Sequence, residues 1–86
     1  MDFVLSHHAE QEIERRGIPR DMIRETMHNP GQILPERGGT KAYQSIFDFG
    51  NDKMYLLRII VNDHADPPVV VTAYRTGNIA KYWRNS

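Results

Sequence analysis

The sequence predicts an α+β fold in which two N-terminal helices pack on an antiparallel sheet of three or four strands. Two observations lead to this prediction. Apolar side chains recur at helical spacing over residues 7–16 and 19–28, whereas alternating and β-branched runs follow at residues 41–49, 54–61 and 69–75. Short polar segments separate the runs, so strands that are neighbours in sequence are expected to pair in the sheet.

The first predicted helix has recognisable signals at both ends. Ser6 precedes it, and a serine hydroxyl at this position can accept a hydrogen bond from an amide of the first turn. Ala9 and Ile13 lie four residues apart on one face, and Gly17 is expected to end the helix in the left-handed conformation. A second amphipathic helix over residues 19–28 stops at Asn-Pro-Gly, so the two helices are expected to form a hairpin.

Strand signals dominate the rest of the chain. Residues 41–49 and 54–61 alternate in polarity on either side of a tight Gly-Asn-Asp connection, which indicates a β-hairpin. The run 69–75 is apolar on both faces for most of its length, which is typical of an inner strand covered on both sides. Residues 32–34 favour a short extended piece, and residues 79–84 favour a short helix or an extended tail.

The composition predicts one folded domain over residues 1–86 and excludes several classes of site. Hydrophobic residues make up 40% and charged residues 26% of the chain, as in ordinary globular domains. Lysine plus arginine equals aspartate plus glutamate at 11 each, so no overall field attracts nucleic acid. The end of the chain is nevertheless locally basic, because Arg75, Lys81 and Arg84 stand there without acidic neighbours in sequence. The absence of cysteine excludes disulfides, cysteine-ligated zinc and thiol catalysis.

The sequence favours a cytoplasmic protein without a cofactor, a metal or a membrane partner. No signal-peptide pattern begins the chain, and no apolar run approaches the ~20 residues that a membrane span needs. The histidines lack the i, i+4 pairing of a zinc-binding helix, and we expect them to be scattered; they are His7, His8, His28 and His64.

Five short segments carry a resemblance to a known family. They are Leu-Ser-His-His-Ala at residues 5–9, Arg-Gly-Ile at 16–18, Asn-Pro at 29–30, Val-Thr-Ala-Tyr at 71–74 and Lys-Tyr at 81–82. The chain thereby resembles domain-of-unknown-function family 4258, a small bacterial and cyanobacterial family. The resemblance implies the compact fold of RelE and ParE toxins and a toxin-like protein that binds RNA or cleaves it without a metal. Glu12 departs from the family pattern, which has an arginine at this position in many members, so a cationic site is less complete here.

His8 is the first candidate catalytic residue. Metal-independent RNA cleavage needs a group that accepts the proton of the ribose 2′-hydroxyl and a group that protonates the leaving oxygen, and imidazole titrates in the right range for both. Glu12, one helical turn further on, is a candidate to orient His8. The alternative is that His8 caps or packs near Ser6 while Glu12 and Arg16 form an ordinary ion-paired helix face.

The basic C-terminal end supplies the other candidates. Arg75 and Lys81 are expected to stabilise a phosphate, and aromatic rings interleaved with cations are typical of single-stranded nucleic-acid binding. The alternative is a tail in which Tyr82 and Trp83 pack on the sheet while the cations stay in water. The candidate catalytic residues are thus His8, Arg75 and Lys81, and the candidate substrate-binding residues are Arg16, Thr72, Tyr74 and Tyr82.

Two functions remain open on the sequence. The first is a domain that contacts RNA, as an endoribonuclease or as an RNA-binding protein. The second is a non-catalytic module that binds an antitoxin-like or other protein, or pairs with a second copy as a homodimer. The balanced charge and Glu12 favour the second function, whereas the first requires the fold to bring His8, Arg75 and Lys81 together.

Overall fold

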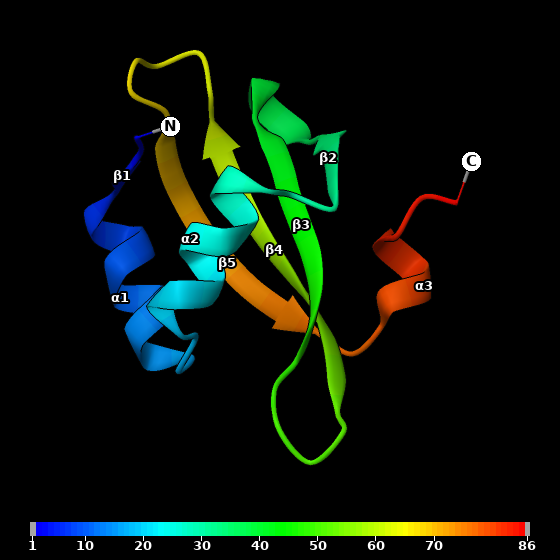
Figure 1. Ribbon diagram of the computed structural model, residues 1–86. Helices are drawn as coiled ribbons and strands as arrows, with labels where there is room; N and C mark the ends of the chain where they lie inside the picture. The colour runs from blue at the N-terminus through cyan, green and yellow to red at the C-terminus, as the bar shows by residue number, and fades with distance from the viewer. Residues whose placement is uncertain (1, 86) are drawn as a thin grey trace.

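Two helices lie on one face of a five-stranded sheet, and a short third helix lies on the other face, in the computed structural model, which describes residues 2–85 (Figure 1). The strands stand in the order β1-β5-β4-β3-β2, which places β4 at the centre. The elements in chain order are β1 (Val4–Leu5), α1 (His7–Arg15), α2 (Arg20–His28), β2 (Gln32–Pro35), the 3₁₀ turn η1 (Arg37–Gly39), β3 (Lys41–Asp48), β4 (Met54–Asn62), β5 (Val69–Thr76) and α3 (Ile79–Tyr82).

The predicted antiparallel sheet of three or four strands is wrong, because the sheet has five strands and is mixed. Val4 and Leu5 pair in parallel with the first two residues of β5, and β2 pairs antiparallel with β3 at the opposite edge. Two residues are too few to show a strand pattern in the sequence, and their partners lie more than sixty residues away. The expected RelE- and ParE-like arrangement of two helices on a purely antiparallel sheet is therefore also wrong for this chain.

The helices lie where the sequence predicted them, with small shifts at their ends. The Ser6 hydroxyl accepts a hydrogen bond from the Ala9 amide at 3.0 Å, as expected for a helix cap. Gly17 has a φ of +64°, the left-handed conformation that glycine adopts without strain. Helix α2 begins at Arg20, one residue later than expected, because Pro19 occupies the cap position with extended backbone.

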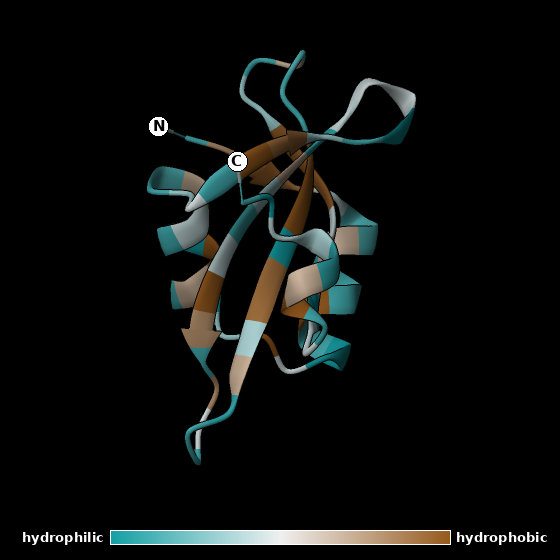
Figure 2. Cartoon of the chain, turned by 90° about the vertical axis from the view of Figure 1, so that its right-hand side faces the viewer, coloured by the Kyte–Doolittle hydropathy of each residue, from teal (hydrophilic) through white to brown (hydrophobic). Residues whose placement is uncertain are grey.

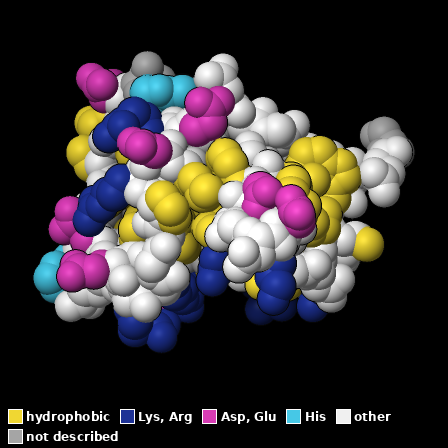
Figure 3. Space-filling model, turned by 60° about the horizontal axis from the view of Figure 1, so that its bottom comes forward, with side chains coloured by type: hydrophobic (Ala, Val, Ile, Leu, Met, Phe, Trp, Pro, Cys, Tyr) yellow, Lys and Arg dark blue, Asp and Glu magenta, His cyan; other side chains and the backbone are white. Residues whose placement is uncertain are grey.

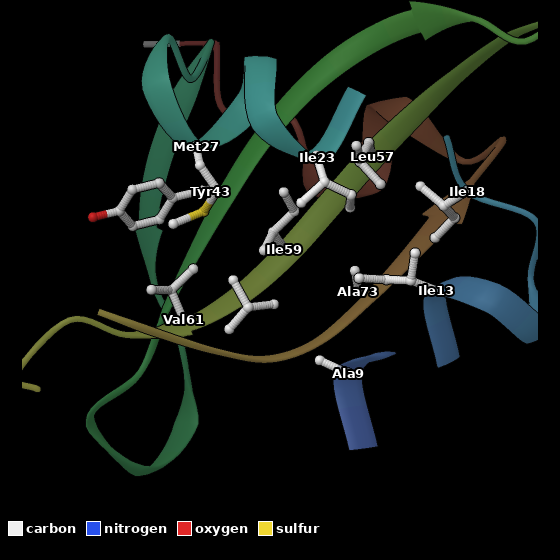
Figure 4. Close-up of a cluster of buried hydrophobic side chains, with 11 residues drawn as sticks. Ala9, Ile13, Ile18, Ile23, Met27, Tyr43, Leu57, Ile59, Val61 and Ala73 are labelled. Atoms are coloured by element: carbon white, nitrogen blue, oxygen red, sulfur yellow. The ribbon is translucent and has the colours of Figure 1, made fainter. Parts of the chain in front are cut away.

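The hydrophobic core fills the space between the helix pair and the sheet (Figure 4). Ile13 of α1 points toward Ala73 of β5, whereas Ile23 of α2 points toward Leu57 and Ile59 of the central strand. All five side chains are buried. Ala9 lets α1 approach β5 closely, because a methyl group is the whole side chain at that contact. Figure 2 shows the most hydrophobic residues concentrated in the strands, whereas the β3–β4 connection is hydrophilic.

Strand β5 contains a bulge that changes which of its backbone groups face outward. Val70 pairs with Val61 and Thr72 pairs with Ile60, so Val71 is an extra residue without a partner on β4. Strand β1 pairs only with the start of β5, and beyond Val70 no strand in residues 2–85 lies on the outer side of β5. Strand β5, which was predicted to be an inner strand, therefore has a neighbouring strand on both sides only at Val69 and Val70.

Within residues 2–85, the helices are all too short and too polar to cross a membrane.

Candidate ligand-binding site

An open depression of about 500 Å³ lies at the outer edge of β5 and is lined by Arg16, Tyr74 and Arg75. Arg16 follows the last turn of α1, while Tyr74 and Arg75 are successive residues of β5. Successive strand side chains point to opposite faces, so the depression reaches from one face of the sheet to the other around the strand edge. We call it the edge pocket. Figure 3 shows several Lys and Arg side chains along the lower side of the molecule in that view.

Arg16 is held in place by two different partners. One guanidinium nitrogen donates to the carbonyl oxygen of Ala73 at 2.7 Å, and the other lies 3.0 Å from a carboxylate oxygen of Glu12. The same carboxylate accepts two hydrogen bonds from Arg15, which hold the pKa of Glu12 below its usual range against the opposing effect of burial. The ion-paired helix face considered as an alternative is therefore present, and a third of the Arg16 side chain remains exposed.

Arg75 reaches the edge pocket across two aromatic rings. Its guanidinium carbon lies 4.6 Å from the centre of the Phe49 ring and 4.7 Å from the centre of the Tyr55 ring. The two rings meet edge to face at 5.5 Å. These contacts orient the guanidinium without neutralising its charge, since an aromatic ring attracts a cation but carries no net charge. Arg75 stays exposed and positively charged.

The face of the sheet that carries the Tyr74 side chain, opposite the helix pair, also holds a buried arginine. Arg58 lies on the central strand β4 opposite Tyr74 and is 3% exposed. Its guanidinium donates to the Tyr74 hydroxyl, to the Gln44 side-chain oxygen at 2.9 Å and to the Glu36 carboxylate at 2.9 Å. Burial acts to lower the pKa of Arg58, but the hydrogen bonds to Glu36 and Tyr74 outweigh it and leave the pKa above its ordinary value. Arg58 is therefore a permanent buried cation.

Helix α3 and the residues after it cover this arginine. The guanidinium carbon of Arg58 lies over the Tyr82 ring, 4.3 Å from its centre. The Gln44 amide donates to the carbonyl oxygen of Tyr82 at 3.2 Å and to the Gln32 side-chain oxygen at 2.9 Å. Gln32 also accepts from the Arg84 amide at 3.1 Å and donates to the Arg84 carbonyl. Two glutamine side chains thus hold the backbone of the C-terminal segment.

Comparison with known proteins gives one match. The family described as a domain of unknown function, DUF4258, matches residues 5–75. The chain belongs to this family. No curated protein and no solved structure matches the chain, so the comparisons lend no support to a relationship with RelE or ParE. The DUF4258 match ends at Arg75, so α3 lies outside it while the residues of the edge pocket lie within it.

The structure brings three of the seven predicted site residues of this DUF4258 domain into one pocket and separates the others. Arg16, Tyr74 and Arg75 line the edge pocket. His8 is exposed in the first turn of α1 and is not part of that lining. Lys81 is exposed on α3, with its ammonium nitrogen 5.1 Å from the centre of the Tyr82 ring.

The remaining two predicted residues lie on the face of the sheet that is opposite the helix pair and carries Arg58. Thr72 is partly buried opposite Ile60, and Tyr82 is joined to Tyr74 through Arg58. The interpretation in which Tyr82 packs back on the sheet agrees with this contact, and Trp83 likewise packs on Gly31, where an added methyl group would lie 3.0 Å from the indole. The catalytic roles of His8, Arg75 and Lys81 stay predictions.

The sequence reasoning missed Arg58 and its partners Glu36 and Gln44. A signal was present, because Arg58 interrupts an otherwise apolar run from residue 56 to residue 61. A charged residue inside such a run marks either an exposed strand face or a buried cation with dedicated partners. In residues 2–85 no group of three or more potential metal-ligating side chains comes together.

Proposed function

We propose that this domain binds single-stranded RNA and that the edge pocket holds a backbone phosphate. The presence of two arginines and one tyrosine in the lining of one open pocket carries the proposal. Arginine matches phosphate well, because its planar fork of N–H donors can form two parallel hydrogen bonds to phosphate oxygens. The lining contains no carboxylate, although Glu12 pairs with Arg16 from one side.

Tyr74 completes the phosphate site as a hydrogen-bond donor. A phenol carries one proton and can also accept hydrogen bonds on its oxygen. Arg58 already donates to that oxygen, so the phenolic proton remains available for another acceptor. Tyr74 therefore supports anion binding rather than opposing it.

The rings beside Arg75 favour single-stranded RNA over a duplex. Phe49 and Tyr55 are partly exposed, and each ring presents an apolar face next to a cation. Proteins that bind single strands without strong sequence preference combine such rings with a positive groove. Because the net charge of the chain is zero, the electrostatic attraction is local, and we expect binding of modest strength that depends on salt.

Binding and cleavage make different demands on the site. Cleavage needs a group that removes the proton of the ribose 2′-hydroxyl, and the lining of the edge pocket includes no imidazole. His8 on α1 is the candidate for this step, with Lys81 as a further cation, and binding alone requires neither residue. A cleavage assay that compares the wild-type chain with His8→Ala separates an endoribonuclease from a binding protein.

The binding test uses a fluorescently labelled single-stranded oligoribonucleotide and a series of salt concentrations, with anisotropy as the readout. Arg16→Gln and Arg75→Gln should each weaken binding about fivefold or more and lower the slope of log affinity against log salt by about one. The matched control is Arg37→Gln, an exposed arginine of η1 at the other end of the sheet. An equal loss in Arg37→Gln, or no binding by the wild-type chain at low salt, would contradict the proposal.

One observation favours a second function as a protein-binding module. No strand within residues 2–85 covers the outer edge of β5 beyond Val70, where the Val71 and Ala73 carbonyls accept hydrogen bonds from the side chains of Ser6 and Arg16. An extended segment of a partner that displaces these two side chains can add there as a further strand. The candidate partners are an antitoxin-like or other protein and a second copy of this chain. Sedimentation equilibrium tests the second copy, and a monomer over the whole accessible concentration range would contradict a homodimer.

A further inference from the structure

We propose that the sheet face beneath α3 is a nucleobase site, and that the Tyr82 ring occupies it within the free protein. This inference deepens the RNA-binding proposal and rests on it. The site consists of Arg58 as the stacking surface, with Gln44, Gln32 and Glu36 as groups that can read the edge of a base. We call it the Arg58 site.

The first argument is the cost of burying Arg58. The residue lies on the central strand and is 3% exposed, so its charge has been removed from water. Burial of a charged group costs several kcal/mol, and apolar residues of similar size often serve stability equally well or better. Leu56 and Ile60 stand on the same face of the same strand and show that apolar side chains fit there. Stability alone therefore does not account for the polar cluster around Arg58.

The second argument is the geometry of what Arg58 already binds. Its guanidinium carbon lies over an aromatic ring at 4.3 Å from the ring centre, a distance at which an arginine can also stack on a base. Around this ring, Gln44 donates to the carbonyl of Tyr82, while Gln32 both donates to and accepts from the backbone of Arg84. A nucleobase offers the same combination, namely a flat ring with donors and acceptors along its edge. Tyr82 and the backbone after it thus supply a ring for Arg58 and polar backbone groups for Gln44 and Gln32.

The third argument is that the cover is small and lies outside the matched domain. Helix α3 has four residues and no side-chain hydrogen bond at its N-cap, and it is joined to β5 through Gly77. The DUF4258 match ends at residue 75, whereas Arg58, Gln44, Gln32 and Glu36 all lie inside it. Apart from its link to β5, the segment is held through Tyr82, Trp83 and Arg84, so a ligand that replaces the contacts of these three residues can displace it.

Tyr74 connects the Arg58 site to the edge pocket. It lines the pocket and its hydroxyl accepts a hydrogen bond from Arg58, so one side chain belongs to both sites. A nucleotide with its phosphate beside Arg16 and Arg75 can therefore direct its base around the edge of β5 onto Arg58. This path requires an unpaired base, which agrees with single-stranded RNA as the ligand.

The test uses two kinds of probe on the full-length chain, so that the two sites are measured separately. The four ribonucleosides carry a base without a phosphate, and ribose 5-phosphate carries a phosphate without a base. In Tyr82→Ala the nucleosides should bind about tenfold more tightly than in the wild-type chain, because the competing ring has been removed. Nuclear magnetic resonance titrations should show the side-chain amide signals of Gln32 and Gln44 shifting with the nucleosides. Ribose 5-phosphate should bind both proteins equally.

Three further variants sharpen the test. Tyr82→Phe keeps the ring and should behave like the wild-type chain, while Tyr82→Leu opens the stacking surface with less loss of apolar volume and replaces Tyr82→Ala if that variant does not fold. Arg58→Met in the Tyr82→Leu background should abolish nucleoside binding.

The outcomes separate this inference from the proposed function. Folded Tyr82→Leu that binds no nucleoside, or that keeps its nucleoside binding after Arg58→Met, overturns the Arg58 site. Binding of a synthetic peptide of residues 77–85, with no binding of nucleosides, overturns it in favour of a peptide site. Nucleoside binding without any binding of ribose 5-phosphate instead refutes the edge pocket and leaves the Arg58 site standing.

Discussion

Removal of the negative charge that neutralises Arg58 should destabilise the domain by a measurable amount. The carboxylate of Glu36 lies 2.9 Å from a guanidinium nitrogen, with 4% of the Arg58 side chain and 31% of the Glu36 side chain exposed. Glu36→Gln keeps the shape but leaves the buried cation without its anionic partner. Hydrogen bonds to charged groups contribute about 1.5–3 kcal/mol, and the exposure of Glu36 places the expected loss near the lower end, at about 1.5–2 kcal/mol.

The loss should disappear when the buried charge is removed as well. Arg58→Met replaces the guanidinium by an apolar side chain of similar length, so Glu36 no longer has a buried cation to neutralise. The variant that carries both substitutions should therefore be more stable than Glu36→Gln alone and close in stability to the wild-type chain. Domains of this length have a free energy of unfolding of roughly 4–13 kcal/mol, so a change of this size is well resolved.

Urea unfolding followed by two signals measures the effect. Circular dichroism reports the whole domain, and fluorescence reports the C-terminal segment, because Trp83 is the single tryptophan and packs against Gly31. In Glu36→Gln we expect the fluorescence transition to precede the dichroism transition, since Tyr82 stacks on the arginine that loses its partner. A Glu36→Gln variant as stable as the wild-type chain, with coincident transitions, would refute this account of Arg58.

The remaining predictions concern the core and the opposite end of the sheet. Ile59→Ala should lower the free energy of unfolding by about 2–5 kcal/mol in denaturant titrations, because the side chain is fully buried, whereas Val4→Ala, at an exposed position, should change it by less than about 0.5 kcal/mol. Thr26→Val should leave stability unchanged or raise it, because the buried Thr26 hydroxyl has no hydrogen-bond partner in residues 2–85; a clear loss would reveal a partner. The hydrogen bond from Lys41 holds the pKa of Asp63 below its ordinary value of 3.8, so this pair should stabilise the fold above about pH 4 and lose that effect as the pH falls through the lowered pKa. Acid titration of Asp63→Asn should therefore show a smaller loss of stability over this range than the wild-type chain, and an unchanged acid transition would argue against the pair.

The helices and the long hairpin follow from local sequence. Ser6 caps α1 as expected, Gly17 adopts the left-handed conformation, and the alternating runs pair residue by residue from Lys41 with Val61 to Asp48 with Met54. These features depend on residues close together in the chain, and helical spacing and strand alternation record them directly.

The candidate site was predictable in part. Arg16, Tyr74 and Arg75 stood out in the sequence as polar residues near the ends of apolar runs, and the structure places all three in the edge pocket. His8 stood out because imidazole is suited to acid–base catalysis, but the type of a side chain does not predict where it lies in the fold. In the structure His8 is exposed and is not part of the lining of that pocket. Arg58 was overlooked because its meaning depends on Glu36 and Gln44, which lie 22 and 14 residues away.

The sequence by itself thus determined the helix pair, the β3–β4 hairpin and the apolar β5 strand, because each is specified by the periodicity of neighbouring side chains. The tertiary structure alone decided the parallel pairing of β1 with β5, the bulge at Val71 and the meeting of Arg58 with Tyr74 and Tyr82. Backbone pairing over more than sixty residues leaves no periodic trace in the side chains, and a buried cation shows its partners only after the chain has folded around it.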